Sequence, residues 1–416
     1  MLVVTSNWAI GDGTLLRSAT LRSSTGWQAT LPSAIHRAAV RGGFRRDGGY
    51  RPIDGLDLVV AGDTFDWLVS AEWCGRVRPW HGGASAREAR LRVAVGSVRS
   101  ARRLLVTLAR WARQGLAVPM ADGRGRPGSD YAIVPVRVTL LAGDRDFALA
   151  EFARFAARMR FAMGERWENA DVSIRHGHDL DPACHRSDEQ SPTVSGGRTP
   201  TLSESVAVDL VARFVASVGR GAVAGPVVAL LRAIVACPAV EIPFAVGAWR
   251  RHLPHHALLE IEPIESAWRR AVAGWLVEAR RCVPSCEVEF DALHCLAGWF
   301  DHAFRSADAD VVIPVGVHRL AGWAASGRPR ARDETVNRSL IGHPGQIAWE
   351  GAACPSAAGA TVSRRFGQGP VVLALHRGDA GICEEVIVSG ERQDPVVTID
   401  SSMQRWDHGG TVVDAA

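Results

Sequence analysis

Short apolar runs alternate with longer amphipathic stretches in the first half of the chain. Each run is aliphatic and often β-branched and has polar or glycine-rich neighbours, as buried strands do. We expect strands at 2–5, 56–61, 136–142 and 172–175. Helical spacing of apolar and arginine residues predicts helices over 87–114 and 147–163. This alternation is typical of an α/β layer fold.

The pattern becomes nearly all helical after residue 203 and returns to strands after residue 304. The expected helices are 205–218, 227–237, 265–281 and 289–305, and the expected later strands are 310–316, 371–375 and 385–388. Two stretches rich in turn-forming residues, 121–130 and 185–203, are predicted to be loops. We therefore divide the chain into a first domain part at 1–203, a helical insert at 204–304, and closing strands with a tail at 305–416.

Composition narrows the class of protein. The chain has 416 residues, 47% of them hydrophobic and 22% charged, which is enough to bury a core without disulfides. All 48 basic residues are arginines, but the net charge is only +4 and gives no clear nucleic-acid signal. Eight scattered cysteines and no secretory signal at the start favour a cytoplasmic protein. The most apolar stretch, 227–246, is interrupted by charges and prolines, which favours a buried or interfacial helix over a membrane span.

Polar residues with metal-binding side chains follow several of the predicted strands. Asp63 comes after the second strand, Asp144 after the third and His176 after the fourth. Ligands collect at the carboxyl ends of strands in open α/β sheets, and mixed oxygen and nitrogen donors suit a divalent cation. Taken alone, a Gly-Asp pair after a strand is as well explained by a capped turn, and His176-Gly-His178 by a surface turn. The ordered recurrence of such residues predicts a metal site at this edge.

The same strand ends resemble the motifs of a known family. Gly-Asp63-Thr-Phe-Asp66-Trp, Gly-Asp144-Arg145-Asp146-Phe, His176-Gly and Val-His318-Arg occur in this order. The order resembles the calcineurin-like metallophosphoesterase family, in the branch that contains UDP-2,3-diacylglucosamine hydrolase, over roughly residues 1–185 and 305–320. The resemblance implies a four-layer α/β/β/α sandwich with a helical insert. It also implies hydrolysis of a phosphomonoester, phosphodiester or pyrophosphate by a metal-activated water.

The resemblance also implies a set of metal ligands. These are Asn7, Asp63, Asp144, His176 and His318, and they would hold one or two divalent ions of manganese, iron or zinc. The family opens with Asp-x-His and closes with Gly-His-x-His, whereas this chain has Asn7-Trp-Ala9 and Gly316-Val-His318. Asp63, Asp144 and His176 are therefore the part of the set expected to hold one ion.

Further residues of these motifs have roles beside the ligands. Arg145 stands where many family members carry a catalytic histidine, and its guanidinium can clamp a phosphate through two parallel hydrogen bonds. The alternative is that Arg145 pairs with Asp66 or Asp146 and braces the loop. We assign Arg145 and His178 to catalysis, with a replacement metal ligand as the other role of His178. Asp66 and Asp146 are expected to support the ligands without touching the metal.

Three functions remain in competition at this stage. The leading interpretation is a cytoplasmic metal-dependent phosphoesterase that acts on a phosphorylated small molecule or lipid precursor. The rival is a non-catalytic protein of the same fold that serves as a binding or scaffold module, which Ala9 and Gly316 favour. A third is a membrane-peripheral protein whose apolar insert contacts lipid.

Overall fold

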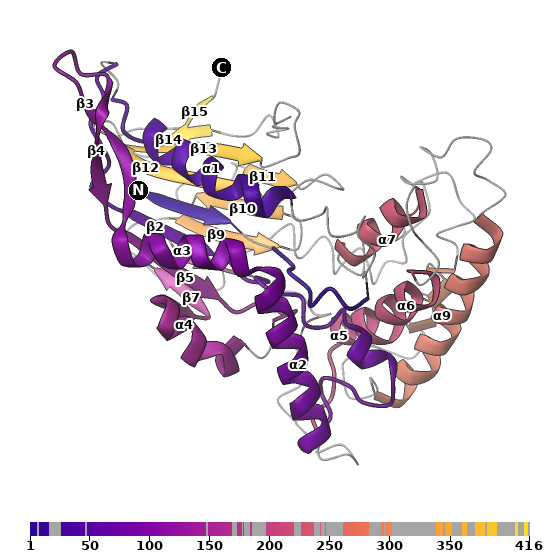
Figure 1. Cartoon of the computed structure of the whole chain (residues 1–416). Coiled ribbons are helices and arrows are strands. Elements are labelled where there is room, and N and C mark those ends of the chain that lie inside the picture. The colour runs from indigo at the N-terminus through magenta and orange to yellow at the C-terminus, as the bar shows by residue number, and fades with distance from the viewer. Residues whose placement is uncertain are drawn as a thin grey trace.

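The computed structural model gives a mixed α/β fold (Figure 1). The residues it describes are 1–5, 8–15, 26–45, 48–146, 149–168, 173–176, 178, 184, 197–219, 226–236, 242, 246, 261–282, 293–294, 297–298, 300–301, 338–343, 346–351, 360–363, 371–378, 381–388, 404–406 and 412–414. From residue 338 onwards the description is of the backbone.

A six-stranded sheet forms the centre of the molecule. Its order is β13 (Gly381–Val388), β12 (Val371–Gly378), β1 (Leu2–Thr5), β2 (Leu56–Val60), β5 (Val136–Leu141) and β6 (Phe161–Gly164). The neighbours β1, β2, β5 and β6 run parallel, while β12 and β13 are antiparallel additions at one side. The predicted strands at 2–5, 56–61 and 136–142 are confirmed. Because these strands are parallel, their carboxyl ends share one edge of the sheet.

Helices α1 (Gly26–Arg41) and α3 (Arg102–Gln114) pack beside each other on the six-stranded sheet (Figure 1). Helix α3 buries Leu104, Leu105, Leu108 and Trp111, whose spacing puts them on one face of a helix. That face contacts β5, and α1 contacts β12 and β13. The core therefore lies between these helices and the sheet.

The single helix predicted over 87–114 is wrong. The structure has α2 (Ala84–Ser100) and α3, separated at Ala101. Ala101 has φ −87° and ψ 0°, and its N–H bonds to the carbonyls of Ser97 and Arg99. This tightened turn ends α2, and the two helices then bury separate apolar faces. Periodicity alone does not reveal such a break, because Ala101 is itself a good helix former.

Two further segments differ from the sequence prediction. The helix expected over 147–163 is a 3-10 turn η3 (Leu149–Phe152), a short α4 (Ala153–Met159) and then strand β6. Arg160 takes a left-handed φ of 60°, which ends α4 and lets Phe161 join the sheet beside β5. The loop expected at 121–130 is the tip of a hairpin between β3 (Leu116–Ala121) and β4 (Pro127–Val134). Much of β4 is exposed, so its sequence lacks the alternation of apolar and polar residues by which a half-buried strand is predicted.

A second sheet lies in contact with the first. Its order is β11 (Ala360–Ser363), β10 (Gln346–Gly351), β9 (Arg338–His343), β8 (Ser173–Arg175) and β7 (Arg166–Glu168). Strands β8 and β9 are parallel, and the other pairs are antiparallel. Contacts of β5 with β7 and of β10 with β12 join the two sheets. The strand predicted at 172–175 is confirmed as β8, whereas the one predicted at 310–316 lies outside the described residues.

The region predicted to be a helical insert is helical where the structure describes it. It holds α5 (Leu202–Ser205), a π-helix η6 (Val206–Ala212), α6 (Arg213–Gly219), α7 (Pro226–Ala236) and α9 (Ile261–Cys282). Figure 1 shows α5, α6, α7 and α9 gathered to one side of the sheets. Trp268 and Trp275 of α9 are buried against Phe300. Of the helices described, none is both long and apolar enough to cross a membrane.

Candidate metal centre

Three side chains from separate strands meet at the carboxyl ends of β2, β5 and β8. Asp63 follows β2, Asp144 follows β5 and His176 follows β8. Each offers one ligand atom, and these atoms all lie within 4.8 Å of one another. The exposed fractions of Asp63, Asp144 and His176 are 1%, 6% and 2%, so the group is buried. The sequence predicted that these three residues would converge, and they do.

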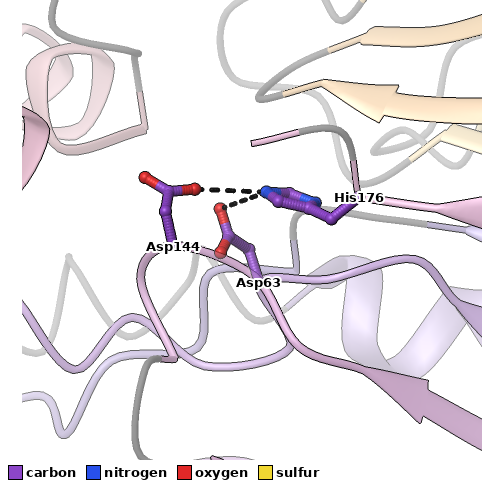
Figure 2. A group of neighbouring side chains, drawn as sticks. All are labelled: Asp63, Asp144 and His176. Atoms are coloured by element: carbon purple, nitrogen blue, oxygen red, sulfur yellow. Dashed lines mark hydrogen bonds and ion pairs between the residues drawn. The ribbon is translucent and has the colours of Figure 1, made fainter. Parts of the chain in front are cut away.

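The imidazole of His176 is oriented by a backbone carbonyl. Its Nδ1 lies 2.8 Å from the oxygen of Ala61, which can only accept, so Nδ1 carries the hydrogen. The other nitrogen, Nε2, lies 3.2 Å from Oδ1 of Asp144 and 3.5 Å from Oδ2 of Asp63 (Figure 2). A neutral imidazole held in this way presents the lone pair of Nε2 between the two carboxylates, as metal-binding histidines do.

Two glycines make room for this close approach. Gly62 has φ 82°, and a Cβ there would lie 2.2 Å from Nδ1 of His176. A Cβ at Gly143 would lie 2.1 Å from Oδ1 of Asp63. Asp63 itself has a left-handed φ of 51°, a conformation that few non-glycine residues adopt and that aspartate adopts more readily than most. The Gly-Asp pairs at both strand ends therefore serve the packing of the three side chains.

Asp66 and Asp146 hold the two loops that carry the ligands. Asp146 is fully buried and accepts hydrogen bonds from the backbone N–H groups of Thr64 at 3.0 Å and Gly143 at 2.7 Å. Asp66 accepts from backbone N–H groups two and three residues ahead, both at 3.2 Å. The two carboxyls contact the loops, and the group of Asp63, Asp144 and His176 does not include them.

Arg145 is buried and joins the site to the helical segment. Its backbone N–H donates to Oδ1 of Asp63 at 3.0 Å. Its Nη1 donates to Oδ2 of Asp66 at 2.8 Å and to the carbonyl of Val235 in α7 at 3.0 Å. Burial works to lower the pKa of the guanidinium, but Asp66, Asp63 and Asp144 outweigh it and raise the pKa, so the group stays charged. This geometry matches the bracing role that the sequence left as the alternative to a phosphate clamp.

A protonated His176 offsets part of the negative charge of the metal-free site. Burial lowers the pKa of His176, yet the carboxylates of Asp63 and Asp144 overcome this and raise it well above the ordinary value. Burial raises the pKa of Asp144, but the hydrogen bond and charge of His176 bring it below the usual range. Burial and the charge of Asp63 raise the pKa of Asp146 to about 8. A protonated His176 can therefore stand between two carboxylates where a cation would otherwise lie.

The remaining predicted site residues are only partly placed. The ring of His178 lies beside that of His176, with centroids 5.4 Å apart. Asn7 and His318 lie outside the described residues, as does Gly316.

The sequence interpretation missed two residues at this site. Ser203 donates from Oγ to Oδ2 of Asp144 at 3.1 Å, and Sγ of Cys184 lies 3.6 Å from the same oxygen. Ser203 was assigned to a loop, although Thr201-x-x-Glu204 is a helix-start signal that would have placed it in a helical first turn.

The donor set fits a divalent cation. It combines two carboxylate oxygens with one oriented imidazole nitrogen, all buried and within reach of a single ion. These donors are compatible with manganese, iron and zinc, since all three metals accept mixed oxygen and nitrogen ligands. Comparisons of the chain with protein-family models, with curated proteins and with solved structures found no match.

Proposed function

We propose that this protein is a metal-dependent phosphoesterase related to the calcineurin-like metallophosphoesterases. The observation that carries the proposal is the convergence of Asp63, Asp144 and His176, the three residues whose motifs best match that family. Gly-Asp turns that serve only as turns are not expected to place their carboxylates within 4.8 Å of the same histidine. His176 lies more than a hundred positions after Asp63 in the sequence.

The architecture supports the same proposal. Two sheets in contact, with α1 and α3 covering one of them, are what a four-layer α/β/β/α sandwich requires of its first three layers. The ligands stand at the carboxyl edge of parallel strands, where such folds bind their substrates. We propose the full sandwich as the fold.

Each residue has a task in this proposal. A divalent ion would act as a Lewis acid on a phosphoryl group and lower the pKa of a water molecule. Asp63 and Asp144 supply the negative charge that holds the ion, and His176 supplies a nitrogen fixed by Ala61. The buried charge of Arg145, which lies among these carboxylates, adds positive potential that favours an anionic substrate. His178, beside His176, is the proposed partner for proton transfer to the leaving group.

A non-catalytic role is the second candidate, and one observation favours it. The ion pairs of His176 with Asp63 and Asp144 offset part of the negative charge of the site without any metal. In addition, Ala9 has no ligand atom at the position where the family has a histidine. A fold that kept this triad as a buried ionic cluster would serve as a binding module.

One experiment separates the two candidates. Metal content and hydrolysis of an aryl phosphate with added manganese would be measured on wild type and on Asp63→Asn. Asp57→Asn is the matched control, because Asp57 lies on the same strand and pairs with Arg137 on the surface. If the protein is a phosphoesterase, wild type and Asp57→Asn should bind metal and hydrolyse the aryl phosphate. Asp63→Asn should do neither. Turnover that is absent in wild type despite bound metal would favour the binding module.

A further inference from the structure

Each of the three ligands has a partner that fixes its orientation. The carbonyl of Ala61 holds His176, and the backbone N–H of Arg145 holds Asp63. The third ligand, Asp144, is held by the hydroxyl of Ser203, which donates to Oδ2 at 3.1 Å. The first two partners are backbone groups near the site, whereas the third is a side chain from the helical segment.

The position of Ser203 is itself well determined. It lies in the first turn of α5, which begins with a capping box: Thr201 Oγ1 accepts from the N–H of Glu204 at 3.2 Å, and Glu204 accepts from the N–H of Thr201 at 2.9 Å. Arg198 makes two further bonds to the Glu204 carboxylate, at 2.6 and 2.5 Å. The next residue, Ser205, is buried and accepts from Nε1 of Trp275 at 3.2 Å. Few groups in this turn can move without breaking a bond.

We propose that Ser203 is a positioning residue that tunes metal affinity by fixing the carboxylate of Asp144. This inference rests on the proposed metal-dependent function. With Oδ2 bound to the hydroxyl, Oδ1 is directed at Nε2 of His176, the atom that would share the ion. Without the hydroxyl, the carboxylate can rotate and lose part of its preorganisation for the ion.

Cys184 contacts the same carboxylate oxygen but is a poor substitute for the hydroxyl. Its Sγ lies 3.6 Å from the same oxygen of Asp144, and a thiol is a weak donor. The thiol cannot replace the charge-assisted bond from Ser203 at 3.1 Å. Loss of an outer partner of a metal ligand typically weakens metal binding 10- to 100-fold, and we expect a loss of this size.

The test compares two variants of nearly the same shape. Ser203→Val removes the hydroxyl, while Ser203→Thr keeps it on a side chain of equal branching. Ser217→Ala is the matched control, since it removes a hydroxyl that bonds to the Phe214 carbonyl within α6. The dissociation constant for Mn²⁺ would be measured by titration calorimetry, beside the melting temperature in the presence of a chelator.

We expect about 10- to 100-fold weaker Mn²⁺ binding in Ser203→Val, with Ser203→Thr and Ser217→Ala within about threefold of wild type. The melting temperatures of the metal-free proteins should stay close together. Equal affinity in wild type and in Ser203→Val would overturn the positioning role while leaving the metal site intact. A wild-type protein that binds no Mn²⁺ or Zn²⁺ would remove the metal site and the positioning role together.

If Ser203→Val proves too unstable to measure, Ser203→Ala replaces it, because Ser203 is half-buried and alanine favours a helical first turn. The same criterion applies: Mn²⁺ affinity equal to that of wild type overturns the proposal.

Discussion

The carbonyl oxygen of Ala61 accepts a hydrogen bond from Nδ1 of His176 at 2.8 Å, across 115 positions of sequence. Ala61 stands two residues before Asp63, so the end of β2 both provides one candidate ligand and orients another. A central strand with parallel neighbours on both sides is a rigid support for this double role.

Gly143→Ala should disrupt the site while leaving most of the fold intact. The new Cβ would fall 2.1 Å from Oδ1 of Asp63, so the carboxylate must move. We expect at least 10-fold weaker metal binding, in line with the usual effect of misplacing a ligand. Gly274→Ala in α9 is the control, since nothing lies within 4 Å of the added atom. Calorimetric titration of both variants with Mn²⁺ checks this, and an unchanged affinity in Gly143→Ala would contradict the geometry.

Arg145→Lys should mainly lower stability. A lysine keeps the charge but cannot reproduce the planar guanidinium that serves Asp66 and Val235 together. Loss of one buried charged hydrogen bond costs about 1.5–3 kcal/mol of unfolding free energy. Denaturant unfolding measures this cost, and turnover per folded molecule should change less than about threefold if bracing is the whole role. A 10- to 100-fold fall in turnover with unchanged stability would instead restore the phosphate clamp.

The buried pair of Asp209 and Arg78 should make stability depend on pH. The two side chains meet at 2.7 Å between η6 and the segment that follows β2. Burial, only partly offset by Arg78, raises the pKa of Asp209 from 3.8 to about 6. Its contribution to stability is therefore present below about pH 4 and is lost as pH rises through about 6.

Asp209→Asn removes this titration but keeps an acceptor for Arg78. The unfolding free energy of wild type relative to Asp209→Asn should fall by about 1–3 kcal/mol between pH 4 and pH 7.5. Urea unfolding at several pH values measures the difference. A difference that stays constant with pH would mean that the Arg78 charge fully offsets burial.

Removal of metal should leave the protein folded but less resistant to heat. A protonated His176 offsets part of the charge of the two carboxylates, so we expect the fold to persist without the ion. Mn²⁺ at 100 times its dissociation constant should add about 2.7 kcal/mol of stability. Melting curves with chelator and with Mn²⁺ would show the shift, and Asp63→Asn should show none. An Mn²⁺-dependent shift of equal size in Asp63→Asn would place the ion elsewhere.

The sequence allowed most strands of the main sheet and the convergence of Asp63, Asp144 and His176 to be predicted, because both depend on local signals. Strands β1, β2 and β5 are short apolar runs, and Asp63 and Asp144 follow two of them directly. Parallel neighbours then place their polar ends together without further information.

The parts that could not be predicted depend on tertiary structure. The apolar residues of β6 continue the helical spacing of the preceding segment. The segment forms a strand because it pairs with the free edge of β5. The bond from Ser203 to Asp144 joins two residues 59 positions apart, and no local pattern announces it. The sequence left the pairing of Arg145 with Asp66 as one of two alternatives, because the burial of these side chains depends on the tertiary structure.

The pairing of β1 with β12 sets a constraint on biosynthesis. Leu2 lies opposite Leu375, so β1 receives one of its two neighbours only after the ribosome has added the long stretch of chain between them, which takes roughly 40 seconds at about ten residues per second. Until then one edge of β1 offers unpaired N–H and C=O groups to any other chain. Contacts this distant in sequence also slow folding. A nascent or truncated chain that lacks β12 therefore exposes an aggregation-prone edge of β1. The other edge of β1 pairs with β2, the strand that precedes Asp63 of the candidate metal centre.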